Sequence, residues 1–206
     1  MYLSRLRLNP ADPRARRDLA DAYEMHRTLA RVYAPDAEQP PARFLWRQER
    51  NANGWPDGTV LVQAASPGRW TELDALPGYL QTLEADKPVD LAALVQLGRR
   101  YRFRLQANPT VTREGKRHGL VREEEQLDWL SRQGQRAGFE VLAAVRGASE
   151  RLSARQGRQR MTVQSVWFDG VLHVTDPDAL RAVLTQGLGH AKALGLGLLS
   201  LAPVAA

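Results

Sequence analysis

The 206-residue chain contains no cysteine, which excludes disulfides, thiolate metal sites and a cysteine nucleophile. Lysine is scarce too: of the 29 lysine and arginine residues, only Lys87, Lys116 and Lys192 are lysines. The four histidines are scattered and no aspartate-rich motif occurs, so the sequence predicts neither a metal site nor a cofactor. The most apolar stretch, ALGLGLLSLAPVAA, is shorter than the roughly 20 residues of a membrane span. The start, MYLSRLRLNP, lacks the apolar core of a signal peptide. We therefore expect a soluble, cytoplasmic protein without membrane contact.

Positive charge dominates what is present. The formal net charge is +6, and the isoelectric point is about 10.1. A hydrophobic fraction of 43% is sufficient for real cores. Arginine, which supplies most of the positive charge, binds phosphates bidentately and stacks on bases. Composition alone indicates only an affinity for polyanions, so the positions of the charges matter more.

Alternation and capping patterns predict the elements of the first half. The segment YLSRLRL (2–8) alternates with period two, as a half-buried strand does. Asp12 and Pro13 are typical of a helix start. Asp21 and Glu24 have a capping-box spacing, so we expect the helix to break and restart there. RFLWRQE and GTVLVQAA predict paired strands around the turn-rich RNANGWPD. WTELDALPGYLQTLE is ambiguous, because its Pro-Gly pair interrupts any long helix.

The second half predicts a similar succession. We expect a strand at 99–107, a basic loop, a helix at 122–136, a strand at 139–145, strands at 161–168 and 171–175, a helix at 177–186 and a strand at 194–201. The order βαββαβ, occurring twice, predicts an α+β fold of two tandem ferredoxin-like (RRM-like) domains. We place the domains at 1–88 and 99–206, with a linker at 89–98.

The strand RRYRFRLQ carries a strict alternation of charge. Arg100, Arg102, Arg104 and Gln106 should project from one face while the intervening apolar residues face the core. A solvated sheet face explains this pattern about as well as a phosphate-binding one. The nearby REGKRHG adds Lys116, Arg117 and His118, and the excess of positive charge over this region favours phosphate binding.

A second basic segment, RGASERLSARQGRQR (146–160), is too polar for a core. It is typical of a protruding hairpin or short helix that enters a nucleic-acid groove, although a mobile surface loop is the alternative. No aromatic residues alternate with its arginines, so shape and phosphate recognition of a folded RNA fits better than readout of single strands. The predicted RNA-binding residues here are Arg151, Arg155, Arg158 and Arg160.

The C-terminal stretch QGLGHAKALGLGLLSLAP contains four glycines around a histidine and a lysine. Glycine lets a backbone approach a phosphate closely, and Lys192 adds a point charge. The spacing matches neither a Walker motif nor a dinucleotide fingerprint. By spacing alone, a tight turn is as good an interpretation as a ligand-binding loop. The residues concerned are Gly187, Gly189, Gly195, Gly197, His190 and Lys192.

NPADPRARRDLADAYEMHRTL near the start and GLGHAKALGLGLLSLAP at the end together resemble the CasE-type CRISPR endoribonucleases of the type I-E Cascade system. The resemblance covers essentially the whole chain. It implies tandem ferredoxin-like domains that bind the stem-loop of a CRISPR repeat and cleave the precursor RNA, without metal, at the 3′ base of that stem. The products would carry a 2′,3′-cyclic phosphate and a 5′-OH. The enzyme would keep the mature guide RNA as a subunit of Cascade, among other Cascade subunits.

The resemblance also implies roles for individual residues. The family's catalytic tyrosine and histidine match Tyr23 and His26, and a lysine that assists in some relatives falls on Arg31. Arginine cannot transfer protons near neutral pH, so Arg31 could only stabilise charge. We add Arg27, on the same predicted helix, to the RNA-binding residues.

The residues themselves suit such chemistry. Cleavage without metal needs the neighbouring 2′-OH as nucleophile and a base to accept its proton. Tyr23 and His26 are three residues apart and share one helix face, and a place near a helix N-terminus would favour the neutral imidazole that a base requires. Tyr23 would orient either the scissile phosphate or the 2′-OH.

Three alternatives remain at the level of sequence. The chain could be a non-catalytic subunit that binds stem-loop RNA, in which His26 merely packs. It could be a structural Cascade subunit that serves assembly. A nucleotide-binding enzyme that uses the glycine-rich loop is weakened by the missing phosphate motifs.

Overall fold

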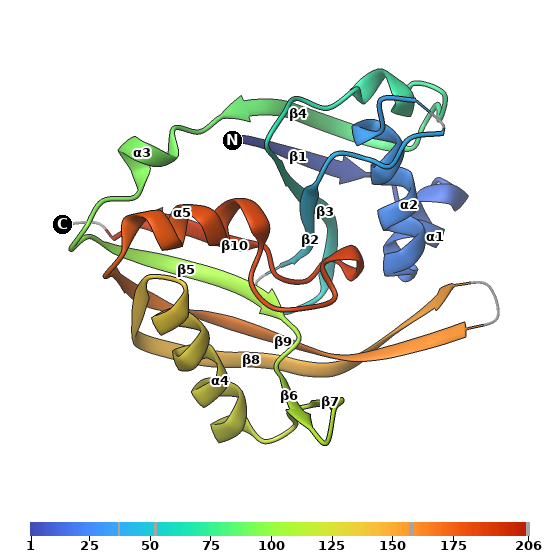
Figure 1. Ribbon diagram of the computed structural model, residues 1–206. Coiled ribbons are helices and arrows are strands. Elements are labelled where there is room, and N and C mark those ends of the chain that lie inside the picture. The colour runs from blue at the N-terminus through green and yellow to red at the C-terminus, as the bar shows by residue number, and fades with distance from the viewer. Residues whose placement is uncertain (37, 52, 157–158, 205–206) are drawn as a thin grey trace. The chain divides into compact units, whose positions relative to one another are not determined.

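The computed structural model describes residues 1–36, 38–51, 53–156 and 159–204. The chain divides into two compact units, each built on one four-stranded sheet (Figure 1). The first unit comprises Met1–Val89, Ala154–Met161 and Ala193–Gly195, and the second comprises Asp90–Ser153, Thr162–Lys192 and Leu196–Ala206.

The first unit contains one complete βαββ succession and a fourth strand. Its elements are β1 (Tyr2–Leu8), α1 (Pro13–Ala20), α2 (Ala22–Tyr33), β2 (Phe44–Arg50), β3 (Pro56–Ala64), the 3₁₀ helix η1 (Trp70–Leu73) and β4 (Leu80–Pro88). The strand order is β2-β3-β1-β4, and β1 pairs antiparallel with both β3 and β4. The position of the second helix is therefore occupied by a single 3₁₀ turn, which explains the ambiguous pattern of that segment.

Local capping explains the helix bounds of this unit. The Asp12 side chain accepts hydrogen bonds from the first turn of α1, and Pro13 opens the helix. Asp21 adopts an extended backbone (φ −130°, ψ 111°) and caps α2, so the chain breaks and restarts as predicted. The apolar faces of both helices pack against β1 and β3. The core consists of Leu6, Leu8, Ala15, Met25, Leu29, Val32, Tyr33, Phe44, Trp46, Val60, Val62, Ala64, Leu73 and Tyr79.

The second unit repeats the same strand order. After the one-turn helix α3 (Leu91–Leu94), its elements are β5 (Arg100–Ala107), β6 (Thr110–Arg113), β7 (Lys116–Gly119), α4 (Glu123–Arg136), β8 (Phe139–Gln156), β9 (Gln159–Val174), α5 (Pro177–Gln186), the 3₁₀ helix η2 (Lys192–Leu194) and β10 (Leu199–Pro203). The sheet order β10-β5-β9-β8 corresponds to β4-β1-β3-β2 of the first unit. Both units thus have the ferredoxin-like arrangement, and the predicted α+β fold class is confirmed.

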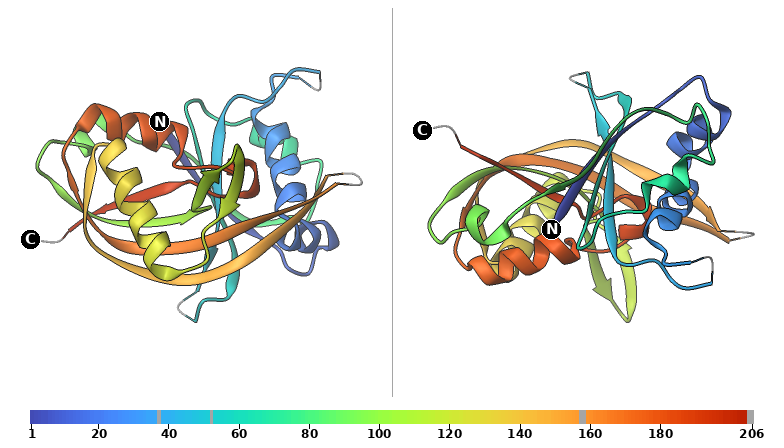
Figure 2. Two further views of the ribbon diagram at one scale, coloured as in Figure 1. Left: turned by 60° about the horizontal axis from the view of Figure 1, so that its bottom comes forward. Right: turned by 90° about the horizontal axis from the view of Figure 1, so that it is seen from above.

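The helices α4 and α5 supply one wall of the second core. Figure 2 shows α4 lying across β8 and β9. Trp129 and Leu130 of α4, and Leu180 of α5, pack with Tyr101 and Phe103 of β5 in one buried cluster. The alternation predicted for RRYRFRLQ is therefore present, because the apolar residues of β5 face this core.

Three predictions for the second half were wrong in detail. The expected strands at 161–168 and 171–175 form the single strand β9, which continues through Gly170 without a turn. A Cβ at Gly170 would lie 2.1 Å from the carbonyl oxygen of Ala143, so this glycine permits close strand approach. The basic loop after β5 is the hairpin β6–β7. The last strand begins at Leu199 rather than at 194, because Gly195 and Gly197 have φ of +77° and +91°.

Within the described ranges, no helix is long and apolar enough to cross a bilayer.

Candidate functional site

Tyr23 and His26 lie on α2 in the first unit. The Asp21 carboxylate accepts a hydrogen bond of 2.8 Å from the backbone N–H of Tyr23, which fixes the first turn. His26 therefore lies in the second turn, three residues after Tyr23 on the same face. Glu24 does not close a capping box, because its carboxylate forms an ion pair with Arg27 at 3.0 Å.

The imidazole of His26 is half-buried against an aromatic side chain. Its ring stacks on Phe44 of β2, with ring centroids 5.0 Å apart and an angle of 18° between the planes. Among the described residues, the buried Nδ1 atom of His26 has no hydrogen-bond partner. Burial lowers the pKa of His26 below its ordinary value of 6.5. The direction agrees with the neutral imidazole predicted from sequence, and its cause is burial.

The stack continues away from His26. Phe44 also stacks on Tyr33, at 5.0 Å and 17°, and Tyr33 meets Trp70 edge-on at 5.9 Å. The indole N–H of Trp70 donates a hydrogen bond of 2.8 Å to Asp86. Asp86 also accepts a bond from the backbone N–H of Gly68 at 3.2 Å. The ring beneath His26 is thus part of a packed aromatic series that ends at a carboxylate.

A buried carboxylate connects α1 and α2 beside the site. The Asp18 side chain is fully buried and accepts hydrogen bonds from Thr28 Oγ1 at 2.6 Å and from the Tyr79 hydroxyl at 2.8 Å. Arg17 donates a third bond at 2.8 Å. Thr28 follows His26 by two residues, so this network fixes the helix that carries the histidine.

The two arginines proposed on α2 differ in their surroundings. Arg27 is exposed, and Glu24 partly neutralises its charge. Arg31 is exposed one turn further along and lines a cavity of about 660 Å³ together with Arg69 and Glu72. Arg69 is already engaged, since it donates to the carbonyl oxygen of Ala34 at 3.0 Å. Arg31 is therefore the better placed of the cavity's two arginines to receive a phosphate.

The second unit carries the charged face of β5. Arg102 is exposed, whereas Arg104 is half-buried. Arg104 donates to Asp169 at 2.8 Å, and its guanidinium lies 5.8 Å from the centre of the Trp167 ring. Arg100 is exposed as well, so among the described residues the positive charge of this strand that no carboxylate pairs with comes from Arg100 and Arg102.

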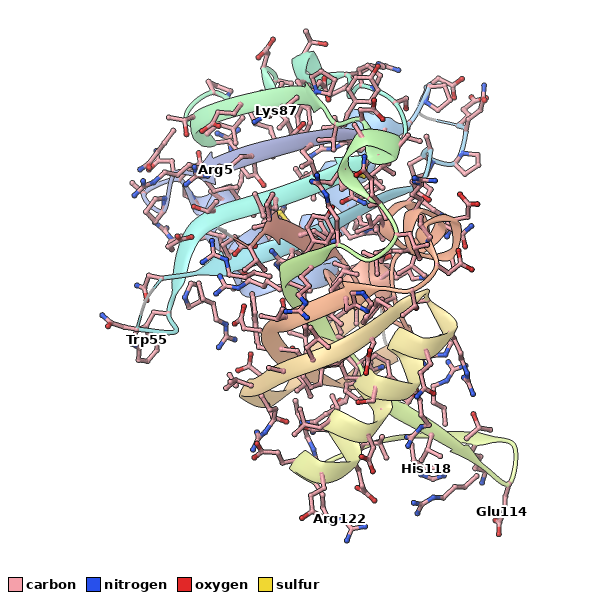
Figure 3. The ribbon with its side chains drawn as sticks, turned by 90° about the vertical axis from the view of Figure 1, so that its left-hand side faces the viewer. Arg5, Trp55, Lys87, Glu114, His118 and Arg122 are labelled. Carbon is pink, nitrogen blue, oxygen red and sulfur yellow. The ribbon has the colours of Figure 1, made fainter. Side chains whose placement is uncertain are left out.

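The hairpin β6–β7 brings basic residues near the glycine-rich loop. Lys116, Arg117 and His118 are exposed on β7, and Figure 3 shows His118 on this hairpin with Glu114 at its turn. The pKa of His190 is lowered by partial burial and then by the charges of Arg117 and Lys192. These residues form one positive cluster within the second unit, although they come from segments about 70 positions apart in the sequence.

The glycine-rich segment is a tight backbone loop. Gly187, Gly189, Gly195 and Gly197 all have positive φ. The backbone N–H of Leu188 bonds to the carbonyl oxygen of Gly197 at 2.8 Å, and the N–H of Gly197 bonds to Gln106 at 2.7 Å. The first bond closes the loop on itself and the second attaches it to the Gln106 carbonyl oxygen of β5, so a tight turn is present whatever the loop binds.

β8 extends to Gln156 and β9 begins at Gln159, so the described part of the segment at 146–160 lies in two neighbouring strands (Figures 1 and 2). Strands rather than a short helix are therefore present there, and the entry of this segment into a nucleic-acid groove stays a prediction. Arg151 is exposed on β8. Arg158 lies outside the described residues, as do the side chains of Arg155 and Arg160.

Sequence reasoning missed two contributors to this site. Phe44 was assigned only to a strand, and Asp18 only to a helix. Their signals were weak, because a phenylalanine in a strand and an aspartate near a helix end are ordinary. Among the described residues, no three His, Cys, Asp or Glu side chains form a group that could hold a metal ion.

Comparisons with known proteins cover nearly the whole chain. A family model described as CRISPR associated protein matches residues 1–203. The CRISPR-associated endoribonuclease Cse3 of Thermus thermophilus is 39% identical over 217 residues, covering 98% of this chain and 100% of the relative. The CRISPR system Cascade subunit CasE of Escherichia coli is 32% identical over 220 residues, covering 99% and 100%. A solved structure of Cse3 bound to a 19-nucleotide RNA has a TM-score of 0.87 at 40% identity, covering 98% of this chain and 100% of that chain.

Proposed function

The chain belongs to the CRISPR associated protein family, and from this premise we propose that it is an endoribonuclease that cleaves CRISPR precursor RNA at the 3′ base of the repeat stem-loop. The observation that carries the proposal is the 39% identity to the Cse3 endoribonuclease across 98% of the chain. A relative named as a Cascade subunit matches over 99% of the chain. The protein accordingly keeps its product RNA and joins other Cascade subunits. We further propose that the protein acts in the cytoplasm.

The proposed reaction uses the RNA, the protein and solvent water. The 2′-oxygen attacks the adjacent phosphorus in line, its proton passes to a base, and the bond from phosphorus to the 5′-oxygen breaks. The leaving 5′-oxygen takes up a proton, from water in the simplest scheme. The products are a 2′,3′-cyclic phosphate and a 5′-OH. Alignment and a base supply most of the acceleration, with general base catalysis typically contributing about 10²–10⁴-fold.

His26 is the base in this scheme. A base must be unprotonated at the start of the reaction, and burial, which lowers the pKa of His26, keeps the imidazole neutral near pH 7. With Nδ1 buried, Nε2 is the nitrogen that accepts the proton of the 2′-OH. Tyr23, on the same helix face, orients the 2′-OH or the scissile phosphate.

Positive side chains hold the RNA in place. Arg31 stabilises the developing negative charge on the phosphorane, and it does so as a fixed charge rather than as an acid. Arg102, together with the β6–β7 hairpin and the glycine-rich loop, contacts the phosphates of the stem. Such contacts recognise the shape of a folded RNA and position it, while the base acts at one phosphate.

The test is single-turnover cleavage of a repeat hairpin RNA in excess EDTA. We expect the native chain to cleave at the stem base and His26→Ala to bind the RNA but not to cleave it. His173→Ala is the control for cleavage, because this partly buried histidine lies 3.9 Å from Glu140 in the second unit and is not part of the proposed catalytic pair on α2. Tight binding without cleavage by the native chain would refute the enzyme and favour a subunit that only binds RNA.

A further inference from the structure

A histidine base is usually oriented by a hydrogen bond at the ring nitrogen that faces away from the substrate. His26 has no such bond among the described residues, because its buried Nδ1 has no partner. The rotation of an imidazole about its last torsion is broad and soft. Without a second restraint, Nε2 would therefore occupy a range of positions relative to the RNA.

The structure supplies that restraint through the face of the ring. Phe44 lies nearly parallel to the imidazole, at 18° and 5.0 Å. Phe44 is itself only 7% exposed, and its strand position is fixed by pairing with Ala64 of β3.

Phe44 cannot turn freely either. Tyr33 stacks on it at 5.0 Å, and Trp70 closes the series with its indole N–H bonded to Asp86. The Phe44 ring is thus packed against Tyr33, and Tyr33 is in turn packed against Trp70. A rigid flat surface of this kind restricts the imidazole to one plane.

We propose that Phe44 is the positioning residue of His26: its ring sets the plane of the imidazole and presents Nε2 to the RNA, in place of a hydrogen bond at Nδ1. The catalytic part of this inference rests on the proposed function, whereas the stacking itself does not. Phe44 touches no reacting atom, so it acts only through His26.

If Phe44 orients His26, residue 44 must have a flat ring. The test therefore compares a variant that lacks the ring with one that keeps it. Leucine at position 44 would fill much of the volume but offer no plane, and tyrosine would keep the plane. A displacement of about 1 Å in a reacting group can cost on the order of 100-fold in rate. We therefore expect Phe44→Leu to lower the single-turnover rate constant at saturating protein by roughly 10- to 100-fold, with the Kd for the RNA unchanged. Phe44→Tyr should cleave close to the native rate.

Phe139→Leu is the matched control for lost packing. Phe139 is fully buried in the core of the second unit and belongs to a different cluster from Phe44. It should lose stability like Phe44→Leu but keep the native rate constant in the folded protein. A rate constant for Phe44→Leu equal to that of this control would overturn the proposal.

Proton NMR tests the placement without any cleavage. The stacked Phe44 ring should shift the ring-proton resonances of His26 upfield in the native protein, and Phe44→Leu should remove that shift. The resonances are assigned by their loss in His26→Ala. Unshifted His26 resonances in the native protein would overturn the proposal even if Phe44→Leu failed to fold. If the native protein binds RNA but never cleaves it, the proposed function fails, whereas the NMR result still decides whether Phe44 orients the ring.

Discussion

Replacing Asp18 by alanine should destabilise the first unit strongly. The side chain is fully buried where α1 meets α2. Its two oxygens accept hydrogen bonds from Thr28 at 2.6 Å, Tyr79 at 2.8 Å and Arg17 at 2.8 Å. Both hydroxyl partners belong to buried residues, so water cannot easily replace the lost acceptor.

The magnitude follows from the groups left behind. An unsatisfied buried hydroxyl costs about 1–3 kcal/mol, and Asp18→Ala leaves two of them. The Arg17 side chain is 52% exposed, so solvent screens the loss of its ion pair and that loss adds little. We therefore expect the free energy of unfolding to fall by about 2–6 kcal/mol from the two hydroxyls, a large part of the roughly 5–15 kcal/mol typical of a folded domain. Asp18→Asn, which retains one acceptor oxygen, should lose less.

The assay is urea unfolding followed by tryptophan fluorescence and circular dichroism. Asp178→Ala serves as the control, because Asp178 also pairs with an arginine at 2.8 Å, yet its side chain is 93% exposed. This control should lose less than about 1 kcal/mol. If Asp18→Ala unfolded at the same urea concentration as Asp178→Ala, the buried network would not stabilise the fold.

Other expectations concern pH, the glycine-rich loop and salt. Because burial lowers the pKa of His26 below 6.5, the folded state binds fewer protons than the unfolded chain; stability should be full above that pH and fall as pH decreases through the folded pKa. Urea titrations across this range should show a shallower loss for His26→Ala. Gly197→Ala should destabilise the protein more than Gly115→Ala. Both glycines have positive φ, but of the two only Gly197 lies where a Cβ would meet a backbone atom, the carbonyl oxygen of Leu188 at 2.6 Å. Thermal unfolding of the two variants decides this. RNA affinity should fall steeply with salt, and Arg102→Ala should reduce the slope of log K against log salt by about 1; an unchanged slope would show that this side chain contacts no phosphate.

Several elements were predictable from sequence because their causes are local. Asp12 with Pro13 opens α1 as the pattern predicted, since a cap and its N–H groups lie within three residues of each other. Asp176 with Pro177 opens α5 in the same way. The strand at 2–8 and the charged face of β5 followed from period-two alternation, which each strand carries in its own residues. The α+β class followed from the order of these elements.

The predictions that failed depended on partners distant in sequence. From the sequence, Gly170 was placed between two strands. In the structure it lies within β9, where the absence of a side chain leaves room for the carbonyl oxygen of Ala143 on the neighbouring strand. The segment after β3, whose pattern was ambiguous, forms a single 3₁₀ turn, because Pro77 and Gly78 leave too few residues for a helix before β4 begins at Leu80.

In the candidate site, too, some features have local causes and others depend on residues distant in sequence. The common helix face of Tyr23 and His26 follows from their spacing alone, because three residues nearly complete a helical turn. The stacking of His26 on Phe44 and the hydrogen bonds of the buried Asp18 to Thr28 and Tyr79 arise only when the chain folds. Such contacts join segments that are far apart along the chain, and their geometry arises from how a strand and two helices pack. Capping and periodicity extend over a few residues and carry no information about that packing.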